Sequence, residues 1–434
     1  MQKLDAVVSL SPGDRSSHML DLYKKYKFIP IILRVRQMET PEIAKDIDDV
    51  IAKLKKRIPK IVVIDDKGKM KHAIKALSDF NVRAIVPYEE TVPYGDKLAK
   101  ILKIAGNDPK TSLLRKNKDS LNQLLAKKGI RSIKSLILKS NTTVDKIVAY
   151  FKNHFPLVLK PVYGSSSVNV FVVKNQKELA EKINFFRTLD RKTLKILGDI
   201  VIQEFITGTE YVANYISNNG RHILTDLWYY EKFKDADGKV IYHRTNLIKK
   251  LTPLTKKIAQ YGFAVLNAMK YNVGPTHLEI KVDRHGPVLI EANLRIMGGL
   301  FFKNEPLVGK YPTYEFALLA YFNSPLIEPF FKNPVYQPNP NHVTAYTLYS
   351  NQSYKIKSIV SDAYMKKTFP TFQQWKLYVK AGGFLQKTID YITFPGEIEF
   401  ASPDAKKIEA DCAKLNAIEK TGLQSIFIKE PLKR

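Results

Sequence analysis

The sequence predicts an α/β protein built from several lobes, and two patterns together with the chain length indicate this. Residues 1–108 alternate short apolar runs, such as 31–35 and 60–65, with amphipathic segments, which is typical of a parallel sheet flanked by helices. Residues 200–325 are richer in strand patterns. A chain of 434 residues is long enough for three or four lobes of ordinary size.

Further elements follow from the same patterns. We expect a helix near 119–129 and strands within 157–173. A helix over 256–271 carries apolar residues at helical spacing and would face the core. The Pro-rich stretch 333–341 is the clearest linker. A last helix, over about 403–420, places the single cysteine of the chain on its apolar stripe. Hairpin turns are expected at Asn218-Asn219-Gly220 and Asp237-Gly238.

Composition limits the class of protein. A hydrophobic content of 44% with 26% charged residues is typical of a globular chain. No run of about 18 apolar residues occurs, so no membrane span is expected. The first residues lack a signal-peptide core, which predicts a cytoplasmic protein. With Cys412 as the only cysteine, an intramolecular disulfide and a cysteine-based metal cluster are excluded, and a buried structural cysteine is expected.

The formal net charge of +28 suggests another class, a protein that binds nucleic acid or anionic lipid. The lysines, however, are spread along the whole chain, and solvated helix faces explain them as well as a binding patch does. No zinc-finger, RRM or KH pattern is present. We therefore expect no specific nucleic-acid partner.

The most informative segment is 276–295, which reads as a tight hairpin. One face of the hairpin carries Glu279 on the first strand. On the second strand, the same face carries Leu289, Glu291 and Asn293. A three-residue loop ending in a left-handed Gly286 sets Glu279 opposite Glu291. Like charges about 5 Å apart destabilise a sheet. A divalent cation held by carboxylate and amide oxygens, usually Mg²⁺ with nucleotide phosphates, would offset this repulsion. Two solvated glutamates on an exposed strand are the alternative.

Upstream of the hairpin the chain reads as a strand, a loop and a second strand. Lys160 ends the first strand, and the loop that follows contains Gly164, Ser165, Ser166 and Ser167. Its backbone N–H groups and small hydroxyls could wrap phosphate oxygens. The GxxxxGK[ST] pattern of a Walker loop is absent. An ordinary polar hairpin loop is the alternative.

The order of these parts resembles the ATP-grasp superfamily. After the Lys160 strand and the small-residue loop come Gln203-Glu204-Phe205-Ile206-Thr207-Gly208-Thr209-Glu210, the Glu279 strand, and a Glu-x-Asn-x-Arg motif that ends at Arg295. The resemblance covers about residues 110–325. Residues 84–99, Gly106-Asn107, the segment 115–118 and the C-terminal third look more specifically like the L-amino-acid (dipeptide) ligase group.

The resemblance implies a domain plan. It predicts an ATP-grasp fold with α/β and α+β lobes, in which an N-terminal Rossmann-like pre-ATP-grasp domain covers residues 1–108. ATP-grasp subdomain A, with the phosphate loop, would cover 109–199. Subdomain B, with the metal and nucleotide residues, would cover 200–332, and a C-terminal α+β lobe would cover 333–434.

The resemblance also implies roles for single residues. Lys118 and Lys160 match lysines that hold nucleotide phosphates, and the loop from Gly164 through Ser165 and Ser166 to Ser167 matches the phosphate-covering loop. Glu204 and Ile206 match positions whose backbone groups pair with adenine, and Glu210 matches a ribose-binding carboxylate. Glu279, Glu291 and Asn293 match magnesium ligands, and Arg295 matches an arginine on the transferred phosphate. The chain departs from the family pattern at Asn117, where aspartate is more frequent, and at Asn169, where glycine is common.

The implied reaction is the ATP-dependent joining of a carboxylate to an amine. The carboxylate attacks the γ-phosphorus to give an acyl phosphate, the amine attacks the acyl carbon, and phosphate leaves. Alignment and charge neutralisation are the main demands of such chemistry. Arg295 and Lys160 are the expected catalytic residues. Two Mg²⁺ ions are expected, with Glu291 shared between them and Mn²⁺ as an alternative ion.

Substrate recognition is less well defined by the sequence. Glu89 matches an acidic position in the subgroup that could pair with a substrate ammonium group, and a solvated loop carboxylate is the alternative. His243 and Arg244 could contact a substrate carboxylate from a lid, and an exposed basic strand end is the alternative. The expected partners are small amino acids or carboxylic acids, with no membrane partner, and a homodimer stays open.

Two other functions also stay open. One keeps the ATP-grasp fold but uses a different amine acceptor, such as ammonia, a sugar amine or a longer peptide. The other is a basic protein that binds nucleotide or nucleic acid without ligase turnover. The complete set Glu279, Glu291, Asn293 and Arg295 argues against lost chemistry.

Overall fold

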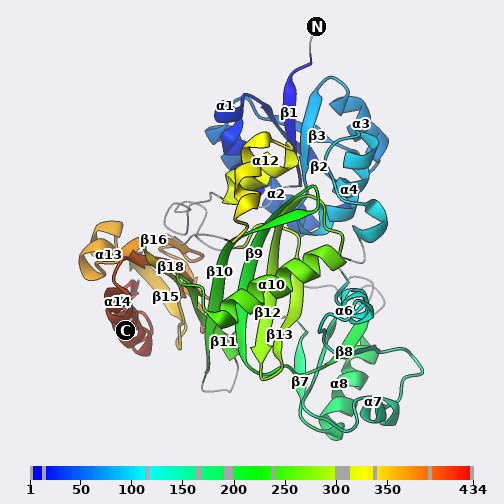
Figure 1. The fold of residues 1–434 in the computed structure, drawn as a ribbon. Helices are drawn as coiled ribbons and strands as arrows, with labels where there is room; N and C mark the ends of the chain where they lie inside the picture. The colour runs from blue at the N-terminus through cyan, green and yellow to red at the C-terminus, as the bar shows by residue number, and fades with distance from the viewer. Residues whose placement is uncertain are drawn as a thin grey trace.

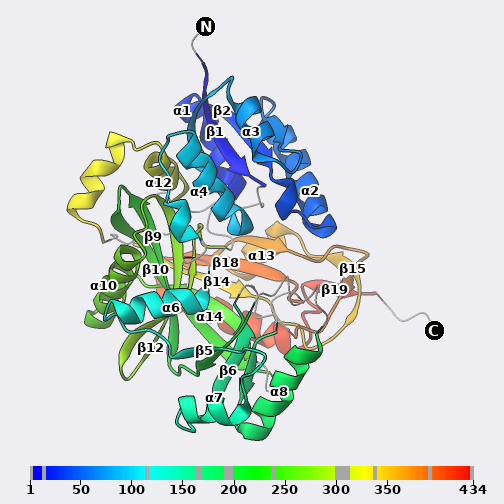
Figure 2. The same cartoon turned by 90° about the vertical axis from the view of Figure 1, so that its right-hand side faces the viewer.

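The structure is a computed structural model. It describes residues 3–11, 16–112, 115, 117–162, 169–189, 199–235, 240–298, 313–335, 340–389 and 393–430. Within these residues the strands form four sheets (Figure 1). Figure 2 shows the N-terminal lobe at the top and the lobe of α7 and α8 at the bottom, with the longest sheet between them. Every described helix is too short or too polar to span a lipid bilayer.

The N-terminal lobe is a parallel sheet flanked by helices, as predicted. Its strands lie in the order β3-β2-β1-β4. Alternate residues of the strands enter two different hydrophobic clusters: Val8 packs with the outer helices, whereas Val7 packs into the main core of the protein. The strands therefore read as continuous apolar runs because both faces are covered. The strands are β1 (Asp5–Leu10), β2 (Ile29–Arg34), β3 (Val62–Asp65) and β4 (Asn81–Val86), and the helices are α1 (Tyr23–Tyr26), α2 (Pro41–Arg57), α3 (Met70–Leu77) and α4 (Val92–Ile101).

A small antiparallel sheet forms the second lobe, in the order β5-β8-β6-β7. Two helices cover it and share its hydrophobic cluster. Because β8 belongs to this sheet, the lobe extends past the expected boundary at residue 199. The elements are β5 (Ser135–Ile137), α7 (Val144–Tyr150), β6 (Leu157–Pro161), β7 (Phe171–Val173), α8 (Gln176–Thr188) and β8 (Ile200–Glu204).

Helix α6 (Lys118–Lys127) precedes this lobe and packs against the longest sheet. The side chain of Asn117 caps it by accepting a 2.9 Å hydrogen bond from the backbone N–H of Ser120. Asparagine at this position therefore fulfils the capping role that aspartate would have. The cap fixes the start of the helix, and with it the position of Lys118.

The longest sheet has eight strands in the order β13-β12-β9-β10-β11-β14-β18-β16, and its paired strands are antiparallel. The turn predicted at 218–220 is confirmed: Asn219 and Gly220 connect β9 to β10, with φ angles of 51° and 71° typical of a two-residue hairpin. The expected turn at 237–238 lies outside the described residues. The strands are β9 (Thr209–Asn218), β10 (Arg221–Lys234), β11 (Val240–Leu247), β12 (Gly274–Asp283), β13 (Gly286–Asn293), β14 (His342–Thr347), β16 (Phe372–Leu377) and β18 (Gly396–Ser402).

Helices α10 (Pro253–Ala268) and α12 (Thr313–Tyr321) pack on this sheet. A capping box between Thr252 and Thr255 starts α10, and its predicted apolar stripe is buried. Helix α12 also contacts β4 and the 3₁₀ helix η1, so it joins the N-terminal lobe to the central sheet (Figure 1). One continuous hydrophobic cluster therefore runs from β1 and β2 to β9 and β12.

The C-terminal part adds three strands to the central sheet and builds a smaller sheet, β17-β15-β19. Cys412 is buried on α14, as predicted. Asp404 caps that helix, which begins two residues later than expected. The expected linker is partly fixed, because Val335 pairs with Leu224 on β10. The remaining elements are β15 (Tyr354–Ile359), α13 (Asp362–Thr368), β17 (Phe384–Leu385), α14 (Ala405–Lys420), β19 (Phe427–Lys429), and the 3₁₀ helices η1 (Ser16–Leu22), η2 (Arg36–Met38), η3 (Glu89–Thr91), η4 (Pro109–Thr111) and η6 (Pro325–Lys332).

Buried polar contacts lock the N-terminal lobe onto the rest of the chain. Asp96 on α4 pairs with Arg115, and the side chains are 3% and 0% exposed. Asn107 donates to the carbonyl of Val273 at 3.0 Å and accepts the N–H of Asn272 at 2.8 Å. Asn107 and Arg115 belong to the segments that resemble the ligase group, and here they hold lobes together.

The Asp96–Arg115 pair can be tested against an exposed pair of similar chemistry. Asp96→Ala leaves a buried guanidinium without its counter-charge, so we expect a loss of about 3–5 kcal/mol in the free energy of unfolding. Asp5→Ala removes an ion pair to Arg83 whose side chains are 40% and 45% exposed, and we expect about 0–1 kcal/mol. Chemical denaturation measures both, and equal losses in the two variants would contradict this assignment.

Candidate functional site

The hairpin of β12 and β13 sets Glu279 opposite Glu291 and His277 opposite Asn293. The predicted facing of the two carboxylates is confirmed. The predicted loop length is wrong, and a bulge that was not predicted compensates for it. The loop has two residues, Arg284 and His285, because Asp283 pairs directly with Gly286, whose φ is 100°. A bulge between Glu279 and Ile280 then shifts the register by one residue and restores the pair.

The bulge changes which side chains share the face of Glu291. Leu289 is buried in the main hydrophobic core, not beside Glu291 as predicted. Ile290 instead lies next to Glu291, and both line the same cavity. Strict alternation fails here because the inserted residue of a bulge breaks the two-residue period.

This cavity encloses about 220 Å³ between the small sheet and the hairpin. It collects predicted residues from six different elements or their ends, namely α6, β6, β8, β9, β12 and β13. One part of the lining is apolar and the other is densely charged. The apolar residues include Ile133, Val158, Val170, Val172, Phe205, Ile206 and Ile290, and the charged residues are Lys118, Lys160, Glu204, Glu210, Glu279, Lys281 and Glu291.

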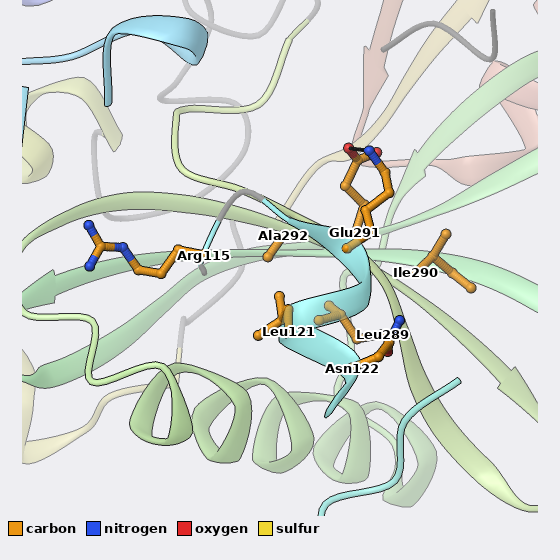
Figure 3. A pocket seen from close by; sticks show the side chains of 8 residues that line it. Arg115, Leu121, Asn122, Leu289, Ile290, Glu291 and Ala292 are labelled. Carbon is orange, nitrogen blue, oxygen red and sulfur yellow. Dashed lines mark ion pairs between the residues drawn. The ribbon is translucent and has the colours of Figure 1, made fainter. Parts of the chain in front are cut away.

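The two facing carboxylates have different electrostatic surroundings. Burial, and then the charges of Glu291 and Glu210, raise the pKa of Glu279 to about 8. Burial also acts to raise the pKa of Glu291, but the ammonium of Lys118, 2.8 Å from its Oε1, together with the charges of Lys160 and Arg295, lowers it (Figure 3). Figure 3 also shows Arg115 pointing away from Glu291, so the partner of Glu291 is the lysine that begins α6.

The described residues contain no cluster of three His, Cys, Asp or Glu side chains arranged as a metal centre. What the hairpin supplies is a carboxylate pair with Asn293 next in line on β13. These are hard oxygen donors, which suit Mg²⁺ when phosphate oxygens and waters complete the coordination. The donor chemistry therefore fits a cation held jointly with a ligand, not a closed protein cage.

Lys160 lies on β6, across from Val201 in β8. Burial and the neighbouring charge of Lys118 lower its pKa to about 8, although Glu291, Glu279 and Glu210 act in the opposite direction. A second ammonium group close enough to lower the pKa of Lys160 marks a place suited to anions.

Glu210 is held by two residues that the sequence did not single out. Lys232 lies 2.8 Å from its Oε2, and the hydroxyl of Tyr242 donates to its Oε1 at 3.0 Å. The ammonium of Lys232 also sits 3.8 Å above the ring of Tyr242. Burial and the Glu210 charge raise the pKa of Tyr242 well above its ordinary value, so the phenol stays a donor. Only the pairing of β10 with β11 brings these residues together, so no local pattern reveals them.

The segment after β8 forms another wall of the cavity. Glu204 accepts the backbone N–H of Lys134 at 2.8 Å. Lys281 donates to the carbonyl of Ile206 at 2.9 Å and lies 5.2 Å from the ring centroid of Phe205. Gly208 follows with φ of 93°, and a Cβ there would collide with the carbonyl of Val282.

Arg295 lies beside this cavity rather than in its lining. It borders a small pocket with Tyr88, Pro87 and Met19, where the N-terminal lobe meets the sheet, and its Nη1 donates to the carbonyl of Ile296 at 3.2 Å. Its charge acts to lower the pKa values of both Glu279 and Glu291, which places it close to the carboxylate pair.

Several predicted residues cannot be placed. Gly164, Ser165, Ser166 and Ser167 lie outside the described residues. Glu89 begins η3, but its side chain is not described. Asn169, at the end of the loop, is described and has a left-handed φ of 58°, a conformation that asparagine tolerates better than most residues.

His243 and Arg244 do not line the cavity, contrary to prediction. His243 contacts Glu419 at 3.0 Å, and Arg244 contacts Glu409 at 2.8 Å, so both side chains join β11 to α14. Arg244 also pairs with Glu231 on β10. No local pattern predicts these contacts, because the partners on α14 lie more than 160 positions along the chain. The pairing of β10 with β11 contains a bulge between Glu231 and Lys232, next to the pairing of Glu231 with Arg244.

Comparisons with known proteins agree on the fold. A family model described as an ATP-grasp domain matches residues 153–304. Dapdiamide A synthase of Enterobacter agglomerans is 27% identical over 238 residues, which are 54% of this chain and 55% of that protein, so the chain spans about half the length of this relative. A D-alanine–D-alanine ligase of Clostridium botulinum is 26% identical over 255 residues, covering 57% of this chain and 80% of that protein.

Solved structures are similar over nearly the whole chain. The L-amino acid ligase from Bacillus licheniformis superposes with a TM-score of 0.72 at 17% identity, covering 96% of this chain and 98% of that one. N5-carboxyaminoimidazole synthetase from Staphylococcus aureus, complexed with ADP, gives a TM-score of 0.67 at 13% identity with the same coverage. At this level of identity the likeness concerns the fold alone.

Gly208, compared with Gly220, tests whether close contact with the backbone of Val282 constrains the wall of the cavity. Gly208→Ala adds a collision with the backbone of Val282 to an unfavourable positive φ, so we expect a loss of about 3 kcal/mol or more in the free energy of unfolding. Gly220→Ala also has a positive φ but open space around it, so about 1–2 kcal/mol is expected. Denaturation of both variants gives the comparison, and an equal cost would mean that the close approach to Val282 does not constrain Gly208.

Proposed function

We propose that this chain, which contains an ATP-grasp domain and has the ATP-grasp fold, is an ATP- and magnesium-dependent ligase. It would join a carboxylate to an amine through an acyl phosphate, releasing ADP and phosphate. The observation that carries the proposal is the Glu279–Glu291 pair, which shares one cavity with Lys118 and Lys160.

The charged part of the cavity suits a nucleotide's phosphates. Lys118 and Lys160 would contact phosphate oxygens as point charges. Glu279, Glu291 and Asn293 would hold magnesium, which supplies neutralisation of the phosphate charge when bound. Phosphoryl transfer needs this alignment and charge compensation more than it needs covalent participation by the protein.

The apolar part of the same cavity suits a planar base. Val158 and Ile290 belong to opposite walls, one on the small sheet and one on the hairpin. The backbone of Glu204 and Ile206 would supply hydrogen bonds to adenine, and Glu210, held by Lys232 and Tyr242, would accept ribose hydroxyls.

The acid and the amine would meet near Arg295, where the charged cavity reaches the N-terminal lobe. A guanidinium suits bidentate contact with the transferred phosphate. Glu89, at the edge of the same lobe, remains our proposal for an ammonium group of the substrate. The resemblance to a dapdiamide synthase and to an L-amino acid ligase supports amino acids as substrates and a dipeptide-type amide as product.

An ATP-grasp ligase with another amine acceptor is the second candidate. The D-alanine–D-alanine ligases among the relatives join two amino acids and so support the first candidate, whereas the fold shared with a carboxyaminoimidazole synthetase shows that the same scaffold can serve another acceptor. The two candidates share the nucleotide site and differ only in the acceptor.

Phosphate release tests the proposal directly. With ATP, Mg²⁺ and pooled amino acids, we expect release that depends on the pool. Glu291→Gln removes the charge of a shared metal ligand and should lower the rate by about 100-fold or more. Glu328→Gln is the matched control, because Glu328 pairs with Arg221 on the exposed surface and should have no effect. Near-normal turnover in Glu291→Gln would refute the assigned role.

The lowered pKa of Lys160 predicts a pH dependence of nucleotide binding. The amine is charged below about pH 8 and neutral above it, so the affinity for ADP should fall as pH rises through that value, by at most about tenfold per pH unit. Lys160→Arg keeps its charge throughout and should show a smaller fall, with the remainder due to Glu279, whose pKa is also about 8. Calorimetric titrations of both proteins provide the measurement. The same fall in Lys160→Arg would show that another group is responsible.

A further inference from the structure

His277 completes a square of polar side chains with the proposed metal ligands. Strand pairing sets Glu279 opposite Glu291 and His277 opposite Asn293. His277 and Glu279 are two positions apart on β12, so they project from the same face of the sheet. The Nε2 atom of His277 lies 3.4 Å from Oε1 of Glu279. Glu279, Glu291 and Asn293 have proposed roles at the cation, whereas His277 has no role in the proposed reaction.

A buried polar chain holds the other side of the His277 ring. Its Nδ1 lies 2.9 Å from Oδ1 of Asn214, directly across the β9–β12 pairing. The Asn214 amide donates through Nδ2 to Asp226. Asp226 also accepts hydrogen bonds from the Trp228 indole and, at 2.9 Å, from the Thr225 hydroxyl. All five side chains are buried, and each is at most 4% exposed.

This chain fixes the orientation of the ring. Because the NH₂ group of Asn214 faces the carboxylate of Asp226, its oxygen must face His277, and Nδ1 therefore carries the hydrogen. Nε2 is left on the side of Glu279. The ring therefore stands 3.4 Å from Oε1 of Glu279 and limits where that carboxylate can lie. Buried networks of this kind restrict side chains to one arrangement.

The same chain also reaches the segment that follows Arg295. The Nδ2 atom of Asn214 lies 3.3 Å from the sulfur of Met297, two positions after Arg295. Asn214 therefore contacts both the histidine behind Glu279 and the chain that leaves β13. One buried amide therefore contacts both the strand that carries Glu279 and the segment that follows Arg295.

We propose that His277 is a positioning residue: the Asp226–Asn214–His277 chain holds Glu279 in the orientation that binds the divalent cation. This inference rests on the proposed function, because it takes Glu279 as a metal ligand. Partners behind metal ligands commonly change metal affinity by about 10–100-fold.

The test is the affinity for Mn²⁺ in the presence of a non-hydrolysable ATP analogue, measured from the electron paramagnetic resonance signal of free Mn²⁺. We expect His277→Leu to weaken Mn²⁺ binding by about 10–100-fold. Asn214→Leu should give a similar loss. The double variant should lose little more than either single variant, because both act through the same contact.

His222→Leu is the matched control. His222 is also buried in the eight-stranded sheet, on β10, and contacts Ser217 at 2.7 Å. Its loss should lower the thermal unfolding midpoint to a similar extent as His277→Leu while leaving Mn²⁺ affinity unchanged. His277→Gln provides a second variant if His277→Leu fails to fold. Its amide can still donate to Glu279, so it should restore part of the affinity.

The outcomes separate this inference from the proposed function. If the unmodified protein binds Mn²⁺ with the analogue and His277→Leu, or Asn214→Leu where His277→Leu does not fold, binds it equally well, the positioning role is wrong. Equal weakening in His222→Leu would also overturn it, since the effect would then be one of general stability. If the unmodified protein binds neither Mn²⁺ nor the analogue, the proposed function itself fails.

Discussion

Two carboxylates that face one another across a pair of strands are the constraint on which this site depends. Glu279 and Glu291 are brought together by backbone hydrogen bonds, so their repulsion cannot be relieved by moving apart. The surroundings of the two carboxylates reduce this repulsion in different ways. Lys118 pairs with Glu291 and keeps it ionised, while burial and its acidic neighbours favour the neutral form of Glu279. Such a pair is costly to keep in a fold unless a cation or a proton occupies the space between the oxygens.

The lobes must be fixed relative to one another for this pair to work, because its neighbours come from different parts of the chain. Lys118 lies three positions after Arg115, whose buried pairing with Asp96 ties this segment to the N-terminal lobe. Asn107 attaches the same lobe to the start of β12, the strand that carries Glu279. The helix cap at Asn117 then sets the direction in which Lys118 leaves the chain. Residues that resemble a ligase signature in the sequence thus act here as interlobe contacts.

How far the sequence predicts this structure depends on whether a feature is local. The parallel N-terminal sheet, helices α10 and α14 and the facing of Glu279 and Glu291 follow from short-range patterns and are confirmed. The predicted loop length of the hairpin was wrong, and a bulge compensated for it. The bulge was not predicted, because a bulge leaves no clear mark in an alternating sequence. His243 and Arg244 were misassigned because their partners on α14 are distant in sequence. Lys232, Tyr242 and His277 were missed because strand pairing, not spacing, gives them their neighbours.

The charges around the cavity explain why a cation is needed at all. The described residues that line it include four glutamates and three lysines, so the lining carries a formal charge of −1 although the whole chain carries +28. The excess positive charge therefore lies elsewhere, where it can attract anions over a Debye length of about 8–10 Å and speed their encounter with the protein. Within the cavity, however, a nucleotide's phosphates would meet a lining that does not neutralise them. The oxygens of Glu279 and Glu291 can become favourable neighbours of phosphate only if a divalent cation enters with it. Under the proposed function, the acidic hairpin would make phosphate binding conditional on metal, and general attraction to a basic protein would not produce that dependence.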